Sequence, residues 1–361
     1  MKKTARIASV AAVIALGLSA CGSRDDESST ADESSTPTAS ATTSAAAQQY
    51  PDFKACMVSD SGGFDDKSFN QTSKAGLDNA VSQYGMQEAD VESTDPSQFA
   101  DNINEMVSQG CNSITTVGFL LGDATEAAAK KNPDIDFSIV DFAYEKAPAN
   151  LKGLTFNTGE PSYLAGYVAA AKSETGVVGT FGGLNIPTVT IFMTGFYEGV
   201  QKYNEDNGTD VQVIGWDPAK PKAGSFTNDF ENKTIGQTTA EEMIKQGADV
   251  IFPVAGPAGL GGLQAAQDND VKAIWVDTDG CVSAAEYCDV LLTSVMKGMD
   301  VAVQQAILDG AEGDFSNDVY VGTLANNGVG LAPFSDDVDA ELQAKVEELK
   351  QQIIDGTIKV G

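Results

Sequence analysis

The sequence predicts an α/β fold of two doubly wound, Rossmann-like lobes with a ligand cleft between them, and three observations lead to this prediction. Short apolar runs rich in Val, Ile and Phe alternate with stretches of helical periodicity from residue 54 to about residue 324. Such alternation is typical of parallel sheets covered by helices on both faces. The runs are too numerous for one small sheet, and the roughly 310 residues after position 51 exceed a single hydrophobic core.

The predicted elements follow one another along the chain with few long gaps. Helical periodicity predicts helices over residues 70–85, 99–110, 188–206 and 238–247. Two doubly wound lobes explain this order better than one large sheet or a TIM barrel. The apolar runs expected to form strands span residues 54–60, 113–119, 137–141, 151–157, 177–183, 211–216, 249–256, 271–277, 290–295 and 319–324.

The ends of the predicted strands carry polar or small residues. Three strands end in aspartate, at Asp60, Asp141 and Asp277, and two end in glycine, at 182–183 and at Gly256. A single aspartate in such a place is usually a turn or capping residue. Three of them favour a lined cleft, because ligands of open α/β sheets bind beyond the carboxyl ends of the strands. Carboxylates only accept hydrogen bonds, so we expect a neutral ligand rich in donors, such as a polyol, amine or nucleoside, rather than a phosphate.

Composition excludes several classes of function. The formal net charge of −30 makes nucleic acid and anionic lipid surfaces poor partners. The chain has no histidine, which excludes the usual hydrolase triads and His-ligated metal sites. Paired acids such as Asp65 and Asp66, or Asp277 and Asp279, would suit a glycoside-cleaving enzyme, but neighbouring acids in an acidic chain are usually solvated. We therefore expect a protein that is not an enzyme and needs no metal or cofactor.

A glycine-rich turn presents a competing signal. It follows the strand that ends near Gly256, and Asp277 lies about 20 residues further on, as in dinucleotide-binding folds. The spacing is G-x-x-G-x-G instead of G-x-G-x-x-G, and Pro257 lies inside the turn. The pattern therefore does not support a dehydrogenase.

The N-terminus has the layout of an export signal. Basic residues at positions 2, 3 and 6 precede an apolar stretch that closes with Leu-Ser-Ala-Cys at residues 18–21. The segment resembles a bacterial lipoprotein signal, which implies removal of residues 1–20 and lipidation of Cys21; an ordinary signal peptide is the alternative. Residues 21–51 are rich in Ser, Thr and Ala, and we expect them to form a disordered tether of roughly 30 Å.

The remaining cysteines indicate disulfides. Setting Cys21 aside leaves four thiols, an even number that suits an oxidising compartment. Four thiols allow three pairings, and the order of the predicted strands favours Cys56 with Cys111 and Cys281 with Cys288. The close C-x-x-C pairs of a zinc site are missing from the sequence.

A series of local motifs resembles one known family. The segment DSGGFDDKSFNQTSKAGL at 60–77 forms a glycine turn after the first strand and leads into a helix. With further matching segments, it resembles the basic membrane protein (BMP) family of substrate-binding lipoproteins, which includes PnrA-like purine nucleoside receptors of ABC transporters. The resemblance spans essentially the whole body. The further segments are SYLAGYVAA at 162–170, GFYEGVQ at 195–201, GSFTNDF at 224–230, ADVIFPVAG at 248–256, WVDTD at 275–279 and LLTSVMK at 291–297.

The resemblance implies a type I periplasmic-binding-protein fold with three crossovers between its lobes. By this resemblance residues 52–158 and 294–320 form lobe 1, and residues 159–293 and 321–361 form lobe 2. It further implies a ligand bound between the lobes and delivery to an ABC permease after lobe closure. We expect the protein to act as a monomer.

The family's ligand contacts can be carried over to individual residues of this chain. Without the family, Phe69 would be expected to pack in the core and Lys297 to be solvated. One departure stands at Gly280, where the family commonly has glutamine, which puts that rim of the pocket in doubt. The implied roles are base stacking by Phe69 and Phe226, base-edge contacts by Asn70 and Asp141, a polar contact from Asp60, ribose contacts by Asp277 and Lys297, and a backbone contact at Gly256.

Together these features predict a receptor, lipid-anchored through Cys21 on the extracytoplasmic face of the cell membrane, that binds purine nucleosides for an ABC importer. A sugar or polyol receptor of the same fold is one alternative. A surface sensor lipoprotein without a role in transport is another.

Overall fold

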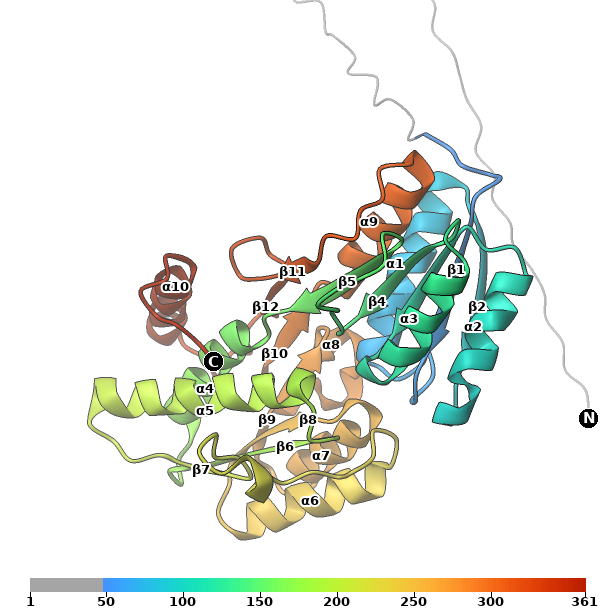
Figure 1. Ribbon diagram of the computed structural model, residues 1–361. Helices are drawn as coiled ribbons and strands as arrows, with labels where there is room; N and C mark the ends of the chain where they lie inside the picture. Colours follow the sequence, from blue (N-terminus) through green and yellow to red (C-terminus); the bar gives the residue numbers. More distant parts are fainter. Residues whose placement is uncertain (1–47) are drawn as a thin grey trace, which may run out of the picture. The chain divides into compact units, whose positions relative to one another are not determined.

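The computed structural model describes residues 48–361, which form two lobes built on separate sheets (Figure 1). The expected signal at 1–20, the lipidation site Cys21 and the tether up to residue 47 lie outside the described residues. The expected end of the tether needs a correction, because residues 48–51 belong to the body. The Tyr50 backbone N–H donates to the Tyr84 carbonyl at 2.8 Å, and the Tyr50 hydroxyl donates to Glu312.

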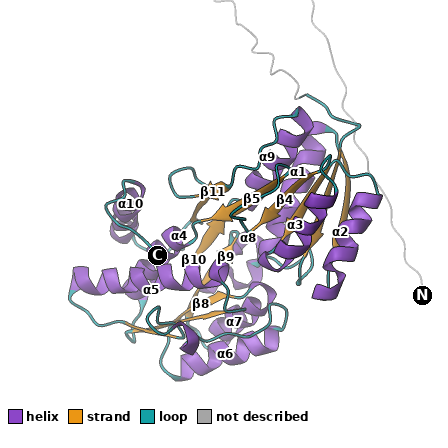
Figure 2. Ribbon diagram, viewed as in Figure 1, coloured by secondary structure: helices purple, strands orange, loops and turns teal. Residues whose placement is uncertain are grey.

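The sheet of lobe 1 contains six parallel strands in the order β11-β5-β4-β3-β1-β2. Helices α1 and α9 pack together on one face and α2 and α3 on the other (Figure 2). The strands are β1 (Lys54–Ser59), β2 (Gln87–Glu92), β3 (Ser113–Val117), β4 (Asp136–Val140), β5 (Leu151–Phe156) and β11 (Tyr320–Gly322). The helices are α1 (Phe69–Tyr84), α2 (Phe99–Ser108), α3 (Gly122–Lys131) and α9 (Met299–Glu312).

The sheet of lobe 2 has the order β12-β10-β9-β8-β6-β7, and only β12 runs antiparallel within it. Helices α4 and α5 pack on one face and α6 and α7 on the other. The strands are β6 (Val177–Gly182), β7 (Gln212–Ile214), β8 (Val250–Val254), β9 (Lys272–Asp277), β10 (Leu291–Lys297) and β12 (Val329–Leu331). The helices are α4 (Gly159–Lys172), α5 (Pro187–Asn207), α6 (Lys233–Lys245), α7 (Gly256–Asp268), the short α8 (Gly280–Ser283) and α10 (Ala340–Ile354).

The central strands are apolar because helices cover both faces of each sheet. All five residues of β8 are buried, as expected for a parallel strand with two covered faces. Strand β2 was not predicted, because its sequence QEADVE lacks an apolar run and lies at the sheet edge. Charged residues on an edge strand discourage pairing with other chains.

The chain crosses between the lobes three times. The crossings lie between β5 and α4, at Gly298 between β10 and α9, and between β11 and β12. The expected boundaries at residues 294 and 320 fall within β10 and at the start of β11. Strand β10 stays in the sheet of lobe 2 up to Lys297, and β11 stays in the sheet of lobe 1 up to Gly322.

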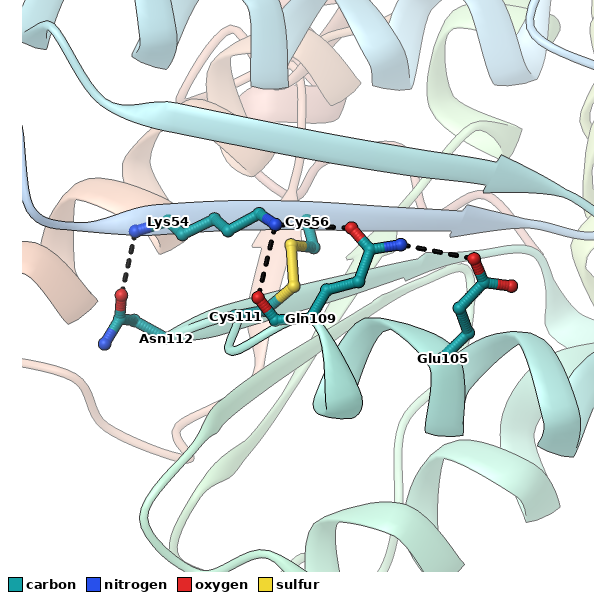
Figure 3. The surroundings of a disulfide bond; sticks show 6 residues. All are labelled: Lys54, Cys56, Glu105, Gln109, Cys111 and Asn112. Atoms are coloured by element: carbon teal, nitrogen blue, oxygen red, sulfur yellow. Dashed lines mark hydrogen bonds between the residues drawn. A yellow bond between two sulfur atoms is a disulfide. The ribbon is translucent and has the colours of Figure 1, made fainter.

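Two disulfides are present, and they join the pairs that the strand order favoured. Cys56 on β1 is bonded to Cys111, which lies just before the neighbouring strand β3 (Figure 3). A hydrogen bond next to this disulfide also joins the two strands: the side-chain oxygen of Asn112 accepts from the Lys54 backbone N–H at 2.8 Å. Cys281 and Cys288 close a short loop between β9 and β10.

The glycines that suggested a dinucleotide-binding turn serve helix packing instead. A Cβ at Gly261 would lie 1.9 Å from the Lys233 carbonyl oxygen, so only glycine lets α7 approach α6 this closely. Gly259 and Gly262 of the same segment face Pro253 on β8, so close packing of α7 accounts for three of these glycines, while Gly256 begins the helix with a φ of +51°. Within residues 48–361, helices of the length and apolarity needed to cross a bilayer are absent.

Candidate functional site

The carboxyl ends of strands from both sheets meet around one cavity. Asp60 follows β1 and Asp141 follows β4 in lobe 1, while Asp277 ends β9 and Lys297 ends β10 in lobe 2. The cavity wall consists of Asp60, Ser61, Asp66, Phe69, Asn70, Gly118, Phe119, Leu120, Asp141, Ile186, Thr188, Val189, Phe192, Phe230, Val254, Ala255, Gly256, Pro257, Val276, Asp277 and Lys297. Seven of the eight residues expected to contact a ligand are therefore brought together here.

Asp141 and Asp277 hold unusual backbone conformations. Their φ angles are 66° and 69°, in the left-handed region that non-glycine residues seldom adopt. This conformation is unfavourable for most residues with a Cβ, and aspartate is one of the few that adopt it as single residues. It turns the chain sharply at the strand end while both carboxylates remain on the cavity wall. Backbone strain of this kind is concentrated at functional sites.

Lys297 links the two lobes inside the cavity. Its Nζ donates to Asp141 Oδ2 at 2.6 Å and lies 3.9 Å from Asp277 Oδ1. Only 3% of the residue is exposed. The ammonium also lies 4.7 Å from the ring centroid of Phe69, with two more phenylalanine rings within 5.6 Å. The expected solvated lysine is thus a buried cation that bridges β4 of lobe 1 and β10 of lobe 2.

Asp60 is a buried acid that directly follows β1. No side chain among the described residues donates to its carboxylate, which lies against Gly118. Burial raises the pKa of Asp60 well above its usual range, and the nearby carboxylates of Asp66 and Asp141 raise it further. A Cβ at Gly118 would fall 1.8 Å from Asp60 Oδ2, so glycine at this φ of +118° makes room for the acid.

Burial also raises the pKa values of the other strand-end acids. For Asp141 it outweighs the opposite effect of Lys297. For Asp277 it outweighs both Lys297 and the hydrogen bond from Ser68. One buried lysine therefore faces more carboxylates than it can neutralise.

Asn70 at the start of α1 offers a second free acceptor. Its Nδ2 donates to the Ser61 carbonyl at 2.9 Å, which orients the amide. Its Oδ1 is buried and has no hydrogen-bond partner among the described residues. An unpaired buried acceptor is costly unless a ligand supplies a donor. Asn70 therefore points to a ligand with an N–H or O–H group at this position.

The aromatic part of the wall differs from the expectation at one residue. Phe69 lines the cavity as expected, whereas Phe226 does not. The Phe226 backbone forms a parallel bridge with Gly182, and its ring packs edge-on against Trp216, with centroids 6.0 Å apart. Phe230, four residues later, lines the cavity instead. The structure places Phe226 outside the wall because its segment is held on β6.

The strand-end glycines at 182–183 also serve the aromatic residues. A Cβ at Gly183 would lie 2.2 Å from the Phe230 ring, and one at Gly182 would lie 2.8 Å from the Phe226 ring. These glycines thus make room for phenylalanine rings and do not themselves line the cavity. Gly256 does line it, at the start of α7.

The departure at Gly280 has a steric reason. A Cβ there would lie 2.5 Å from the Leu291 side chain and 2.9 Å from Trp275. The position is buried and does not belong to the cavity wall. A glutamine could not be accommodated without moving both neighbours.

Several wall residues were not predicted, and Asp66 is the most informative of them. Its neighbour Asp65 has an 86% exposed side chain, whereas Asp66 is only 3% exposed. The sequence offered a signal, since Asp66 stands within the 60–77 motif, but adjacent acids look alike without the fold. Phe119, Leu120, Ile186 and Phe192 complete the apolar wall. Clusters of three or more acidic or cysteine side chains suited to a metal are lacking within 48–361.

Comparison with known sequences relates the chain to one family and to several of its members. The family described as "ABC transporter substrate-binding protein PnrA-like" matches residues 53–361. The chain is 31% identical to the "ABC transporter nucleoside-binding protein BmpA" of Lactococcus lactis, over 86% of this chain and 89% of that protein. It is 32% identical to the "CD4+ T-cell-stimulating antigen" of Listeria monocytogenes, over 100% of this chain and 99% of that protein. It is 28% identical to "Basic membrane protein A" of Borreliella burgdorferi, over 85% and 87% of the two chains.

Comparison with solved structures confirms the fold. An ABC transporter solute-binding protein from Aeropyrum pernix superposes with a TM-score of 0.76 at 26% identity, over 85% of this chain and 92% of that one. A counterpart from Conexibacter woesei superposes with a TM-score of 0.67 at 24% identity, over 86% and 98%. These neighbours confirm the expected type I periplasmic-binding-protein fold with two parallel-sheet lobes.

Proposed function

The chain belongs to the PnrA-like family of ABC transporter substrate-binding proteins, and on this premise we propose that it captures purine nucleosides in its cleft and delivers them to a permease. The family is one of binding proteins and not of enzymes, as the sequence predicted. The observation that carries the proposal is the composition of the cavity wall. It combines several carboxylates, an unpaired amide oxygen and phenylalanine rings.

The polar groups of the wall suit the hydrogen-bond donors of a nucleoside. Asp60 and the Asn70 oxygen are acceptors that other side chains leave available. A purine base and a ribose both present N–H or O–H donors at their edges. The expected division places Asp60, Asn70 and Asp141 at the base and Asp277 and Lys297 at the ribose, and this division stays part of the proposal.

The charge of the wall supports a nucleoside over a nucleotide. Asp60, Asp66, Asp141 and Asp277 all line the cavity, and Lys297 is the one cation among the wall residues. A phosphate group would meet uncompensated carboxylates in a poorly solvated space, which is strongly unfavourable. The relative from Lactococcus lactis is named a nucleoside-binding protein, which supports the same class of ligand.

The phenylalanine rings give a flat base its binding face. Phe69 comes from lobe 1 and Phe230 from lobe 2, and both line the cavity. We propose that these two rings, rather than Phe69 and Phe226, stack on the base. Stacking of a base on an aromatic side chain contributes about 1–3 kcal/mol.

The anchoring and the partners are also part of the proposal. Lipidation at Cys21 would keep the body near the extracytoplasmic face of the membrane and close to its permease. The two lobes, with β10 in lobe 2 up to Lys297 and β11 in lobe 1 up to Gly322, would act within a monomer. A sugar or polyol receptor and a surface sensor without transport remain the alternatives. The phenylalanine rings and the relative's name favour the nucleoside.

Isothermal titration of ligand-stripped protein with inosine, guanosine, adenosine and cytidine tests the proposal. We expect purine nucleosides to bind, and Phe230→Ala to weaken binding about 5- to 150-fold, which corresponds to the stacking contribution. Phe226→Leu is the matched control, since it lies outside the wall, and should change affinity less than twofold. Binding of none of these nucleosides, while sugars bind, would contradict the proposal. Mass spectrometry of small molecules released from unwashed protein identifies the bound compound independently.

A further inference from the structure

The loop between β1 and α1 carries most of the side-chain hydrogen bonds that join the lobes among the described residues. Among the described residues, three hydrogen bonds join this loop of lobe 1 to lobe 2, and the Lys297 contact to Asp141 is a further link. All three come from a stretch of seven residues, so the position of the loop and the closure of the cleft are coupled. The three hydrogen bonds run from Gly62 N to Glu231 Oε1 (3.0 Å), from Trp275 Nε1 to the Lys67 carbonyl (3.3 Å) and from Ser68 Oγ to Asp277 Oδ2 (2.7 Å).

A single buried carboxylate holds the end of this loop. Asp66 Oδ1 accepts from the backbone N–H groups of Ser68 and Gln71, each at 3.0 Å. Its Oδ2 accepts from the Asn70 N–H at 2.8 Å. The first N–H groups of a helix have no acceptor within the helix, so Asp66 satisfies donors that would otherwise be unpaired. Its three hydrogen bonds all stay within the same segment.

The loop conformation needs such support. Lys67 has a φ of 62°, in the left-handed region, and this conformation is unfavourable for a residue with a Cβ. The bond from Ser68 N to Asp66 closes a turn around Lys67, which aspartate side chains commonly stabilise. In this conformation the Lys67 carbonyl accepts from the Trp275 indole of lobe 2.

The same turn positions the ligand-facing residues. Phe69 and Asn70, both on the cavity wall, follow Ser68 directly and form the first turn of α1. Ser68 itself reaches Asp277, a wall residue on the opposite lobe. The turn at residues 66–70 therefore determines the positions both of the residues that would contact the ligand and of residues that join the lobes.

We propose that Asp66 is the positioning residue that couples ligand binding to lobe closure, by holding Lys67, Ser68, Phe69 and Asn70 in one turn. The ligand side of this inference rests on the proposed function, whereas the lobe contacts do not. Charged groups that face Asp66 are Asp60, Lys67 and, from lobe 2, Asp277. Asp66 need not touch the ligand to act in this way.

The test compares Asp66→Ala and Asp66→Asn with the matched control Asp65→Ala. Asp65 is the exposed neighbour, whose carboxylate pairs with Lys67 at the surface. Hydrogen exchange of the 68–71 amides reports the turn without any ligand. Trp275 fluorescence, measured in a Trp216→Phe background, reports the interlobe contact. Titration with inosine reports binding.

We expect Asp66→Ala to expose the 68–71 amides, to shift Trp275 emission and to raise the Kd for inosine at least tenfold. Asp66→Asn should lie between wild type and alanine, because it keeps one side-chain oxygen. Asp65→Ala should match wild type in all three measurements. Core amides of β8, far along the chain from Asp66, should keep their protection.

Two results would overturn the inference. One is unchanged exchange at 68–71 and unchanged Trp275 emission in both Asp66 variants. The other is equal loss of protection in β8 and at 68–71, which would assign Asp66 to overall stability. If wild-type protein bound no nucleoside, the proposed function would fail, and exchange and fluorescence would still decide the role of Asp66.

Discussion

Replacing Lys297 with methionine should destabilise the protein strongly and in a pH-dependent way. Methionine keeps much of the apolar length of the lysine stem but removes the cation. Asp141 would then lose its hydrogen bond of 2.6 Å, and Asp277 would lose a positive charge 3.9 Å away. Both carboxylates remain buried, at 8% and 7% exposure.

The expected magnitude follows from the burial of the pair. Removing one partner of a buried ion pair costs about 3–5 kcal/mol, because the other charge is left uncompensated. Lys202→Met is a suitable control. Lys202 makes a similar contact of 2.7 Å with Asp206, but both side chains are about one quarter exposed. Pairs on the surface contribute about 0.2–1 kcal/mol, so the control should change the free energy of unfolding by no more than that.

The sign of the pH dependence can be stated in advance. Burial already raises the pKa of Asp141, and Lys297 opposes that rise. Without the lysine, the pKa of Asp141 in the folded state should rise further above its unfolded value. A raised pKa means that stability is greatest below the unfolded pKa and is lost as pH increases through the folded pKa. The penalty of Lys297→Met should therefore be larger at pH 8 than at pH 5.5.

Urea unfolding at both pH values measures this effect, provided that the m-value is unchanged. The double variant Asp141→Asn with Lys297→Met should recover part of the lost stability at pH 8, since it removes the uncompensated charge. A loss below about 1 kcal/mol at pH 8, or an equal loss at both pH values, would refute the reasoning. Failure of the double variant to recover any stability would refute it as well.

Three further outcomes follow from the structure. Removing the Cys56–Cys111 disulfide by paired alanine substitution should lower the free energy of unfolding by about 4 kcal/mol in urea, because it closes a loop with a sequence separation of 55. Gly118→Ala should weaken inosine binding at least tenfold by titration, since the new Cβ would displace the Asp60 carboxylate. Burial raises the pKa of Asp66 to about 6. Because the folded-state pKa lies above the unfolded value, this acid alone should make the wild-type protein about 1.4 kcal/mol more stable at pH 5 than at pH 8. Urea unfolding of Asp66→Asn should no longer show this difference between the two pH values.

The sequence was sufficient to locate the strand-end acids. Parallel strands bring their carboxyl ends to one edge of each sheet, and a cleft between two lobes is faced by both edges, so Asp60, Asp141 and Asp277 could be expected at one cleft. Lys297 could not be assigned from periodicity alone and depended on the family resemblance. Its burial between two lobes is a tertiary property, set by strands β4 and β10 that lie in different sheets.

Elsewhere the sequence carried too little information. Phe226 and Phe230 lie in one irregular segment after β7, where no periodicity distinguishes a ring held on β6 from one that faces the cavity. Asp65 and Asp66 are likewise equivalent by composition. Their separation into an exposed and a buried acid depends on the left-handed turn at Lys67, which no neighbouring residue type requires.

The excess of buried acid in the cleft bears on how closure can occur. Asp66 and Asp277 belong to different lobes and act on each other electrostatically, as do Asp141 and Asp277. Bringing the lobes together therefore brings like charges together and removes water from them, and Lys297 compensates only part of this cost. A donor-rich neutral ligand supplies hydrogen bonds to these carboxylates without adding negative charge, whereas a phosphate would add to the repulsion. Under the proposed function, this imbalance would make closure around a neutral nucleoside less costly than closure around a nucleotide.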